Sequence, residues 1–478
     1  MRRFLRKLML AMILLLAAAL ALVIGKSEKL PGDITDHLYN VMSGKASMGA
    51  DRTPGELIRY ARSRLEGHPK LEFFLVPVFD TIQSHYERPV PQITFPRFGK
   101  GQQLTSSTSQ GTADYLVGTV AELTQALLQA TEGQVIELLP GSYRISKMLY
   151  PRNAGRADRR ITVRAAKVNT VTLEVETDQG FYVTKPYWTF ENLRIVGICK
   201  NDEYCEHAFH IVGGAHHTVI RNNHIEDFSA HIKVNGERGE WPDDGLLEHS
   251  TLINTRPRNT TRPVTPFDLV GASRWLVSDN YVANFIKADP KSTAYGIFMK
   301  GAGFAGRIER NVIVCTLGDI SQAGTRVGIS FGGGGSGKSY CRDGACEVEF
   351  SAGKAVNNII AHCNDSGIDV NTSRATFIAH NTLINTGGID IRGEKSSALL
   401  FGNLFEGTSR ARKGGSIRLQ MNLNVSMQDI FANADQLDLH WRNKPENIPS
   451  HQGVKEDLCF RPRPDGTVPG ALEAEGPC

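Results

Sequence analysis

Short runs of alternating apolar and polar residues recur along the chain, and two adjacent copies show the pattern most clearly. Gly367–Asn371 and Gly388–Arg392 each read as a Gly followed by a four-residue strand with apolar first and third positions. A polar turn and a second apolar run follow, marked by Asn381 and Asn403, which lie 22 positions apart. A unit this short cannot bury its apolar side alone, so it must stack on its neighbours. The pattern predicts an all-β chain folded as a single-stranded parallel β-helix.

The Asn that marks each unit predicts a stacked turn. Asn tolerates left-handed backbone geometry and forms an amide ladder when identical turns stack. The long step between Asn311 and Asn358 predicts an insertion around 332–350 or one further degenerate coil. Longer N-terminal units predict loops that build a binding face between about residues 200 and 350. The signal recurs at Asn192, Asn223, Ser250 (a substitute), Asn280, Asn311, Asn358, Asn381 and Asn403.

Alternation also predicts which side chains face outward. In each first strand the second and fourth residues point away from the core. Because neighbouring strands lie about 4.8 Å apart, Lys233, Asp268 and Lys300 are predicted to form a cation–carboxylate–cation cluster. Such a cluster is either a solvated ladder of ion pairs or a functional site. The two outward columns read His210, Lys233, Asp268, Phe298, Ser330, Asp369, Asp390 and Val212, Asn235, Val270, Lys300, Gly332, Asn371, Arg392.

Two loops beside this cluster favour a site. Arg256, Arg258 and Arg262 lie on a Pro-flanked segment before the Asp268 strand, and arginines bind carboxylate or sulfate in bidentate fashion. Trp241 in the preceding loop offers a platform for a sugar ring.

Two histidines are predicted to lie nearest the same face. His210 neighbours Asn235 in the outward columns, and both His210 and His231 are candidates for titration near neutral pH.

The N-terminus predicts export. Arg2, Arg3, Arg6 and Lys7 precede the uncharged apolar run of residues 8–25. This is the pattern of a signal peptide or a signal anchor, and cleavage is left open. The expected location is periplasmic or extracellular, with residues 8–25 anchoring the chain in the inner membrane if they are not cleaved.

Four segments are predicted: a signal or anchor (1–26), a helical and irregular extension with a linker (27–112), the β-helix (113–425) and an irregular C-terminal closure (426–478). Within the extension, the Pro-, Ser- and Gly-containing residues 88–112 read as a strap along the solenoid or, preferably, as a stalk.

A helix is predicted to cover the first coil. Thr119 and Glu122 form a capping-box pattern before a face of Leu123, Ala126 and Leu127. A helix there would cover edge strands that otherwise remain unpaired.

Eight cysteines agree with an oxidising location. Spacing suggests four disulfides, and a zinc site is disfavoured because no Cys-x-x-Cys pair is present. The suggested pairs are Cys199–Cys205, Cys315–Cys363, Cys341–Cys346 and Cys459–Cys478.

Composition and one false motif limit the partners. The net charge of +4 on 478 residues gives no reason to expect a nucleic acid. Gly332–Ser339 satisfies the phosphate-loop pattern, but the residues that follow do not predict the helix that such a loop must open. The expected partner is an acidic polysaccharide, bound by a monomer.

The chain resembles secreted right-handed parallel β-helix proteins, and among them polysaccharide lyases of the chondroitinase B and alginate lyase type. The likeness covers about residues 115–410. It is carried by Glu122–Leu123, Ala126–Leu127, Gly133, Ile136–Leu138 and Pro140–Tyr143 near the start, and by Tyr295–Gly301 with Arg307–Asn311.

The resemblance implies that Lys300 abstracts a proton beside a uronate carboxylate. The family has Arg-His-Gly on the next coil and acidic calcium ligands before the Lys. Here the next coil reads Gly328–Gly332, and no Glu pair precedes Lys300, so Arg326 is the candidate substitute and the usual calcium ligands are not found.

These observations predict an exported enzyme that cleaves an acidic, uronate-containing polysaccharide by β-elimination. Lys300, Asp268 and Arg326 are the candidate catalytic residues, and Lys233 and the 256–262 arginines would hold the carboxylate. One alternative is a glycoside hydrolase that pairs Asp268 with Asp243 or Asp244. Another is a non-catalytic protein that binds or assembles polysaccharide.

Overall fold

The computed structural model describes residues 73, 75–79, 92–104, 111–289, 291–320, 324–333, 336–476 and 478. Contacts divide the chain into two units, Met1–Tyr86 and Glu87–Cys478. In the first unit residues 75–79 are helical. The predicted signal or anchor at 8–25 lies outside the described residues. Among the described helices, none is both long and apolar enough to cross a bilayer.

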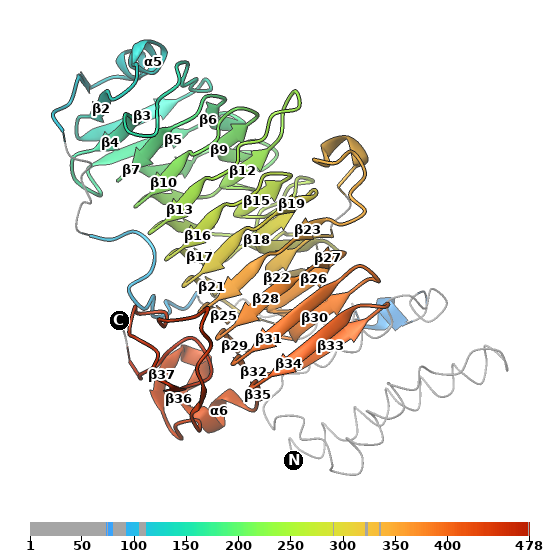
Figure 1. Cartoon of the computed structure of the whole chain (residues 1–478). Coiled ribbons are helices and arrows are strands. Elements are labelled where there is room, and N and C mark those ends of the chain that lie inside the picture. Colours follow the sequence, from blue (N-terminus) through green and yellow to red (C-terminus); the bar gives the residue numbers. More distant parts are fainter. Residues whose placement is uncertain are drawn as a thin grey trace. The chain divides into compact units, whose positions relative to one another are not determined.

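The second unit is a right-handed parallel β-helix, as the sequence predicts (Figure 1). Each coil adds one strand to each of three long sheets, here named A, B and C. Every pairing within these sheets is parallel, and consecutive coils are hydrogen-bonded neighbours. The molecule therefore has three long faces, and position along the chain becomes position along the axis.

The strands of the sheets have the following bounds. Sheet A contains β1 (Tyr115–Val117), β2 (Val135–Leu138), β4 (Ile161–Ala165), β7 (Trp188–Glu191), β10 (Val219–Arg221), β13 (Leu246–Glu248), β16 (Leu276–Ser278), β20 (Arg307–Glu309), β24 (Lys354–Val356), β28 (Thr376–Ala379), β31 (Ser397–Phe401) and β34 (Ser416–Gln420). Sheet B contains β3 (Gly141–Ile145), β5 (Val171–Val175), β8 (Arg194–Gly197), β11 (His224–Glu226), β14 (Thr251–Ile253), β17 (Tyr281–Ala283), β21 (Val312–Val314), β25 (Ile359–Ala361), β29 (Thr382–Ile384), β32 (Leu404–Phe405) and β35 (Leu423–Asn424). Sheet C contains β6 (Gln179–Val183), β9 (His207–Val212), β12 (Ile232–Asn235), β15 (Phe267–Val270), β18 (Thr293–Lys300), β22 (Thr325–Phe331), β26 (Ile368–Asn371), β30 (Gly388–Arg392) and β33 (Thr408–Arg412).

The core is built from stacked columns of identical or similar side chains. The first inward position of sheet C is fully buried in every predicted coil, and the pairing register matches the alignment predicted from alternation. Stacking apolar side chains at the strand spacing buries a continuous core that no single coil could form. The column consists of Phe209, Ile232, Phe267, Ile297, Ile329, Ile368 and Ile389.

An amide ladder follows the turn between sheets A and B. Asn311 accepts from the backbone N–H of Asn280 at 3.0 Å, and its own N–H donates to Asn358 at 2.9 Å. The ladder continues through Asn381 and Asn403 to Asn422, one coil further than predicted.

The left-handed position is not the ladder residue, which corrects the sequence-based reason for Asn. It is the residue before, such as Arg310 with φ 53°. In the coil of β7 and β8, Asn192 takes this left-handed position (φ 62°), and Leu193 takes the ladder position, where its N–H donates to Asn223. Asn192 is therefore one residue out of the predicted register.

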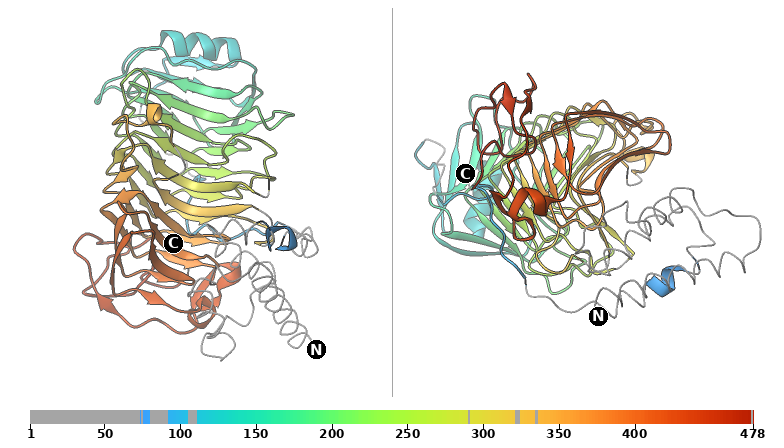
Figure 2. Two further views of the ribbon diagram at one scale, coloured as in Figure 1. Left: turned by 90° about the vertical axis from the view of Figure 1, so that its right-hand side faces the viewer. Right: turned by 90° about the horizontal axis from the view of Figure 1, so that it is seen from below.

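Helix α5 (Val120–Gln129) lies across the N-terminal end of the stack (Figure 2). Thr119 and Glu122 form the predicted capping box, and Leu123, Ala126 and Leu127 are the buried face. The predicted end cover is confirmed.

The 47-residue step holds an insertion and no additional coil, because β22 pairs directly with β26. Its elements are β23 (Phe350–Ser351), which joins β19 (Gly303–Phe304) and β27 (Ser373–Arg374), and a 3-10 helix at Lys338–Tyr340. That helix is a single turn, so the phosphate-loop pattern lacks its structural context.

Residues 92–104 form a strap on sheet B, so the predicted stalk is wrong for this segment. Lys100 donates to Asp279 at 2.9 Å, and the N–H of Ile93 donates to Leu317 O at 2.7 Å. Phe95 and Phe98 pack into a buried cluster with strands of sheet B and with the C-terminal closure.

The closure is more ordered than predicted. It contains α6 (Met427–Ile430), the antiparallel pair β36 (Phe431–Asn433) and β37 (Asp438–Trp441), a 3-10 helix at Ala434–Gln436, and the pair β38 (Ile448–Pro449) and β39 (Gly466–Thr467).

All four suggested disulfides are present, and they use all eight cysteines. Cys315–Cys363 bridges two adjacent coils, and Cys459–Cys478 ties the chain end to the closure.

Candidate functional site

Three charged side chains meet on the outward side of sheet C, as alternation predicts. Lys233 on β12 and Asp268 on β15 are register neighbours, and Lys300 on β18 is paired with Val270, two residues after Asp268. Lys233 Nζ lies 2.5 Å from Asp268 Oδ2, and Lys300 Nζ lies 4.0 Å from Asp268 Oδ1. The predicted cation–carboxylate–cation cluster is confirmed as geometry.

Burial sets the charges of this cluster. The Asp268 side chain is 5% exposed, and those of Lys233 and Lys300 are 20% and 15% exposed. Burial alone would raise the pKa of Asp268, but the two lysines outweigh it and hold that pKa below its usual value. Burial lowers the pKa of Lys300, opposed by the attraction of Asp268 and assisted by the charge of Lys233. Lys300 therefore loses its proton more readily than an exposed lysine.

An aromatic wall flanks Lys300. Its ammonium lies 4.3 Å from the ring centroid of Phe298, and Tyr295 stacks on Phe298 with centroids 4.3 Å apart. After Lys300, the N–H of Gly301 donates to Glu349 of the insertion at 3.0 Å. Burial raises the pKa of Glu349, against the lowering effects of that hydrogen bond and of Lys300. Sequence reasoning gave no site role to Tyr295 or Glu349. Alternation counted back from Ile297 assigns Tyr295 to the core, although its ring stacks on the outward Phe298, and Glu349 lies on an insertion without a period.

His210 on β9 and Asn235 on β12 lie together beside the cluster, as predicted, and Asn235 is two residues after Lys233. His210 Nε2 is 2.7 Å from Asn235 Oδ1, and its Nδ1 is 2.9 Å from Gln179 Oε1. Burial lowers the pKa of His210, so the ring is neutral near neutral pH. His207 stands beside it with ring centroids 5.0 Å apart.

His231 does not belong to this face, contrary to the prediction. It is fully buried, its Nε2 bonds Ile253 O at 3.1 Å, and burial lowers its pKa to about 3. His231 directly precedes β12, and its buried ring packs inside the turn that leads into this strand.

The Trp241 indole packs against backbone glycines and beside the insertion, so less of its ring is free to stack on a sugar than predicted. A methyl group at Gly236 or Gly271 would fall 2.2 or 2.1 Å from the Trp241 ring, so the indole lies directly against these two glycines. The Arg342 guanidinium of the insertion lies 5.6 Å from the ring centroid and donates to Asp243 at 2.7 Å.

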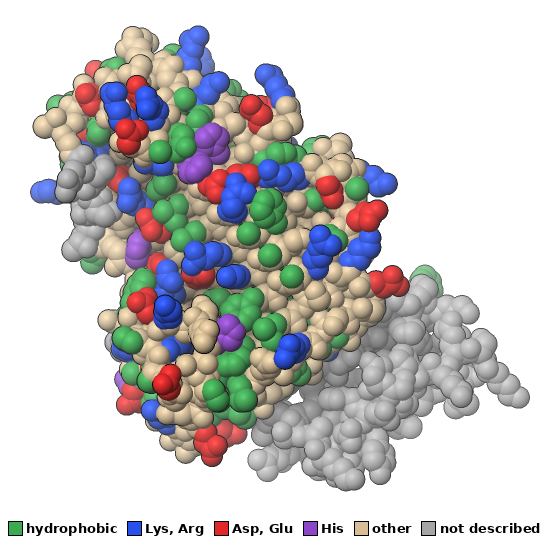
Figure 3. Space-filling view, in the orientation of Figure 1, with side chains coloured by type: hydrophobic (Ala, Val, Ile, Leu, Met, Phe, Trp, Pro, Cys, Tyr) green, Lys and Arg blue, Asp and Glu red, His purple; other side chains and the backbone are tan. Residues whose placement is uncertain are grey.

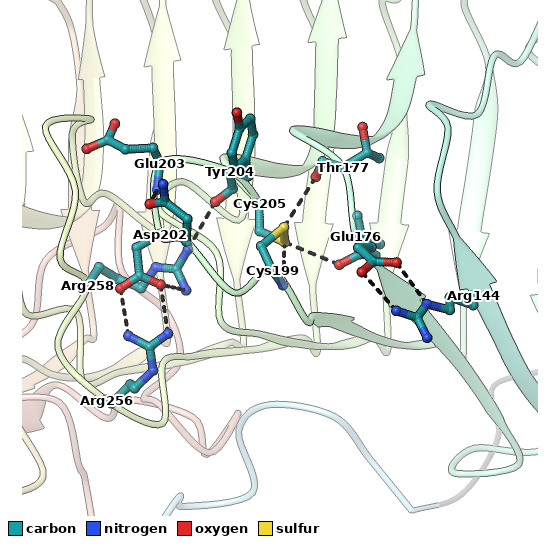
Figure 4. The surroundings of a disulfide bond; sticks show 12 residues. Arg144, Glu176, Thr177, Cys199, Asp202, Glu203, Tyr204, Cys205, Arg256 and Arg258 are labelled. Carbon is teal, nitrogen blue, oxygen red and sulfur yellow. Dashed lines mark hydrogen bonds and ion pairs between the residues drawn. A yellow bond between two sulfur atoms is a disulfide. The ribbon is translucent and has the colours of Figure 1, made fainter.

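The three loop arginines bind acids of this chain, which corrects their predicted role as carboxylate ligands in the groove. Arg256 and Arg258 both pair with Asp202, at 2.6 and 3.0 Å, in the loop closed by Cys199–Cys205 (Figure 4). Arg262 pairs with Glu206 at 3.4 Å. The arginines hold two adjacent loops together.

Arg326 is also away from Lys300. It pairs in register with Ala294, six residues before Lys300, which is about 20 Å along an extended strand. Its side chain is buried and donates to Ile320 O at 3.0 Å. The predicted substitution for a family Arg is therefore not supported by the geometry.

The predicted hydrolase acids are held in ion pairs. Arg274 lies 2.6 Å from Asp244 and 3.3 Å from Asp243, and its hydrogen bond to Asp244 lowers the pKa of that carboxyl. The pKa of Asp268 is lowered as well. A hydrolase needs one carboxyl whose pKa is raised so that it can donate a proton, and neither Asp244 nor Asp268 offers it. Asp243 is held by Arg342 at 2.7 Å in addition to Arg274.

The residues around Lys300 do not suit calcium. Asp268 is held by two ammonium groups, and an oxygen-rich carboxylate set is what calcium requires. Elsewhere in the described residues, one group of three side chains has metal-ligand spacing, and two of its members, Cys341 and Cys346, form a disulfide.

Charges of both signs are interspersed over the face seen in Figure 3, with uncharged surface between them. No broad surface of one sign is visible on that face. This fits the near-balanced composition and recognition by local groups.

No protein-family model and no curated protein sequence matches the chain. Solved structures similar to it include an alginate lyase from Paenibacillus sp. str. FPU-7 (16% identity, 65% of this chain and 94% of that chain, TM-score 0.37). Pectate lyase Pel9A (15%, 78% and 98%, 0.46) and a rhamnogalacturonan lyase (13%, 79% and 96%, 0.45) are others. Likenesses this weak assign no role to any residue here, and the β-helix rests on the strand register described above.

Proposed function

We propose that this protein is an exported polysaccharide lyase that cleaves a uronate-containing polymer by β-elimination, with Lys300 as the base. The observation that supports it is the juxtaposition of Lys233, Asp268 and Lys300 on the outward side of sheet C. The strap packs on sheet B and the closure packs on sheets A and B, whereas these three side chains lie on sheet C.

Elimination needs a base at the carbon next to the uronate carboxylate and a cation that stabilises the developing negative charge. The buried Lys300 amine, with its lowered pKa, is suited to take the proton. Lys233, fixed by Asp268, supplies a positive charge next to it. Asp268 is then a positioning residue that holds both lysines.

Export is part of the proposal because the four disulfides form and persist in an oxidising compartment. The predicted signal or anchor at 8–25 would deliver the chain there. Acidic polymers outside the cytoplasm are a substrate class that such a protein meets.

The test uses the purified protein with polygalacturonate, polymannuronate and chondroitin, and follows the ultraviolet absorbance of unsaturated products. Lys300→Ala should abolish it. Lys300→Arg should abolish it too while preserving binding, because arginine keeps the charge but does not release its proton at accessible pH. Lys354→Ala, an exposed lysine on sheet A, is the matched control and should be fully active.

The wild-type rate should rise with pH as the Lys300 amine loses its proton. Unsaturated product formed by Lys300→Arg at the wild-type rate would overturn the assignment of the base. Polymer binding that is equal in the wild type and in Lys300→Ala, with no unsaturated product from either, would instead identify a binding protein.

A further inference from the structure

A second charged cluster lies at the C-terminal end of sheet C. Arg410 and Arg412 on β33 pair with Asp390 of β30, at 3.2 and 2.6 Å. Arg392 on β30 pairs with Asp369 of β26 at 2.9 Å. All five side chains belong to the outward columns that begin with His210 and Val212.

The layering of this cluster separates it from an ordinary surface ion pair. Asp369 and Asp390 side chains are 3% exposed, while those of Arg392, Arg410 and Arg412 are 21%, 21% and 27% exposed. The two carboxylates are thus buried beneath the three arginine side chains, and the guanidinium groups are the part of the cluster exposed to solvent. Held in place by buried carboxylates, these groups lose little freedom when they bind a further anion.

Charge adds to this picture. Burial raises the pKa of Asp369 to about 6, against the pull of Arg392, and burial also raises the pKa of the nearby Asp365. Burial would also raise the pKa of Asp390, but Arg412 and Arg410 outweigh it and hold that pKa below its usual value, so Asp390 stays a carboxylate. The surface is cationic above an acidic floor.

The second cluster is aligned with the first along the axis of the β-helix. One outward column contains Lys300 on β18, Arg392 on β30 and Arg412 on β33. Arg392 lies three strand steps from Lys300, or about 14 Å, and Arg412 lies four steps away, or about 19 Å. The column positions between them are neutral, Gly332 and Asn371. A polymer along the axis would meet cations at both ends and neutral surface between.

We propose that Arg392, Arg410 and Arg412 form a subsite for the carboxylate or sulfate of a sugar several units from the bond cleaved at Lys300. The enzyme would then take long acidic polymers, laid across the strands of sheet C. This inference rests on the proposed function, whose catalytic group is Lys300.

Binding is measured by calorimetry in the Lys300→Arg background, so that the ligand is not consumed. The probes are polygalacturonate and polymannuronate, each as a polymer and as its disaccharide. The test variant adds Arg410→Gln and Arg412→Gln together with Asp390→Asn, which removes the carboxylate that would otherwise be buried without a partner. Arg307→Gln, an arginine paired with Glu309 on sheet A, is the matched control.

The test variant should lose about ten- to a hundredfold in affinity for a polymer, and the loss should shrink at high salt. Disaccharide affinity should not change, because a short ligand at Lys300 does not reach the second cluster. Arg412→Lys, which keeps the charge but not the fork of donors, should lose less. The control should bind as the background does.

Unchanged polymer affinity in the test variant would overturn the subsite, and so would an equal loss for disaccharide and polymer. If the wild type forms no unsaturated product but polymer binding falls in the test variant, the proposed function fails and the subsite stands. If neither polymer binds the background protein, both are overturned.

Discussion

Burial decides the charge of individual histidines in this protein. His231 is fully buried, and desolvation, only partly offset by its hydrogen bond to Ile253 O, lowers its pKa to about 3. His362 is buried beside Phe95 of the strap, and its pKa falls to about 4 for the same reason. When the pH falls below the ordinary histidine pKa, the unfolded chain binds a proton at each of these rings, whereas the folded chain does not until the pH reaches the lowered pKa.

A folded pKa below the unfolded one means that stability is complete above about pH 6.5 and is lost as the pH falls toward the folded value. At about pH 5 each of these histidines should cost about 2 kcal/mol of unfolding free energy. His231→Gln should remove its share of that loss, measured by urea unfolding at neutral pH and at about pH 5. His440→Gln, at an exposed ring, should leave the loss in place; an unchanged pH dependence in His231→Gln would contradict the argument.

Residue patterns predicted the centre of the site but not its surroundings. Alternation alone places Lys233, Asp268 and Lys300 together, because a parallel register converts sequence position into spatial adjacency. It does not reveal that Arg256 is paired with Asp202, since that partner lies 54 residues away in another loop. Ion pairs between loops depend on loop conformations that carry no period.

At the scale of the elements, the Asn ladder fixes the turn between sheets A and B. Asn311 is buried and uses its side chain fully: its oxygen accepts from the N–H groups of Asn280, and its nitrogen donates to Val277 O and to Asn358. Removing it leaves buried donors and acceptors unpaired, which is more damaging than losing an exposed hydrogen bond.

Asn311→Ala should lower the free energy of unfolding by about 3 kcal/mol. Asn311→Ser should lose less, because Ser250 accepts the backbone N–H of Asn223 at 3.2 Å in the same ladder. Urea unfolding measures both, and Asn424→Ala, at an exposed side chain, should change stability by no more than about 0.5 kcal/mol. Equal losses for Ala and Ser at position 311 would show that the acceptor is not what matters.

The secondary-structure elements could be predicted well from the sequence, because the same residue pattern recurs in coil after coil and each copy supports the same assignment. The strands of sheet C, helix α5 and the ladder all follow from the sequence, whereas the register at Asn192 is wrong by one residue. In that coil Asn192 occupies the left-handed position, and Leu193 fills the ladder. Since Asn suits both positions, a single coil cannot distinguish them, and only the hydrogen bonds do.

For the whole molecule, the strap joins distant coils and the chain end. Lys100 is buried and pairs with Asp279, which also binds Arg310 at 3.0 Å, and the Phe460 ring lies within cation–π distance of both cations. Sequence reasoning preferred a stalk because this Pro-containing segment has no period, and its partners are distributed over several coils. The strap is held in place by tertiary contacts with sheet B and the closure, and not by a local pattern of its own.

Asp279→Asn should cost about 3–5 kcal/mol, because it leaves Lys100 buried without a counter-charge. Lys100→Met should cost less, since Asp279 keeps Arg310. Thermal unfolding of the two variants tests the difference. A larger loss in Lys100→Met than in Asp279→Asn would contradict a role for Asp279 as the shared anchor.

The ladder residues Asn280, Asn311, Asn358 and Asn381 follow one another after 31, 47 and 23 positions, yet each stacks directly on the next. The contour length of a coil is thus free to vary while its pitch is not. Insertions and deletions between the strands can accumulate in this protein without moving a single rung, so that new loops can be tried over the same fixed row of lysines and arginines.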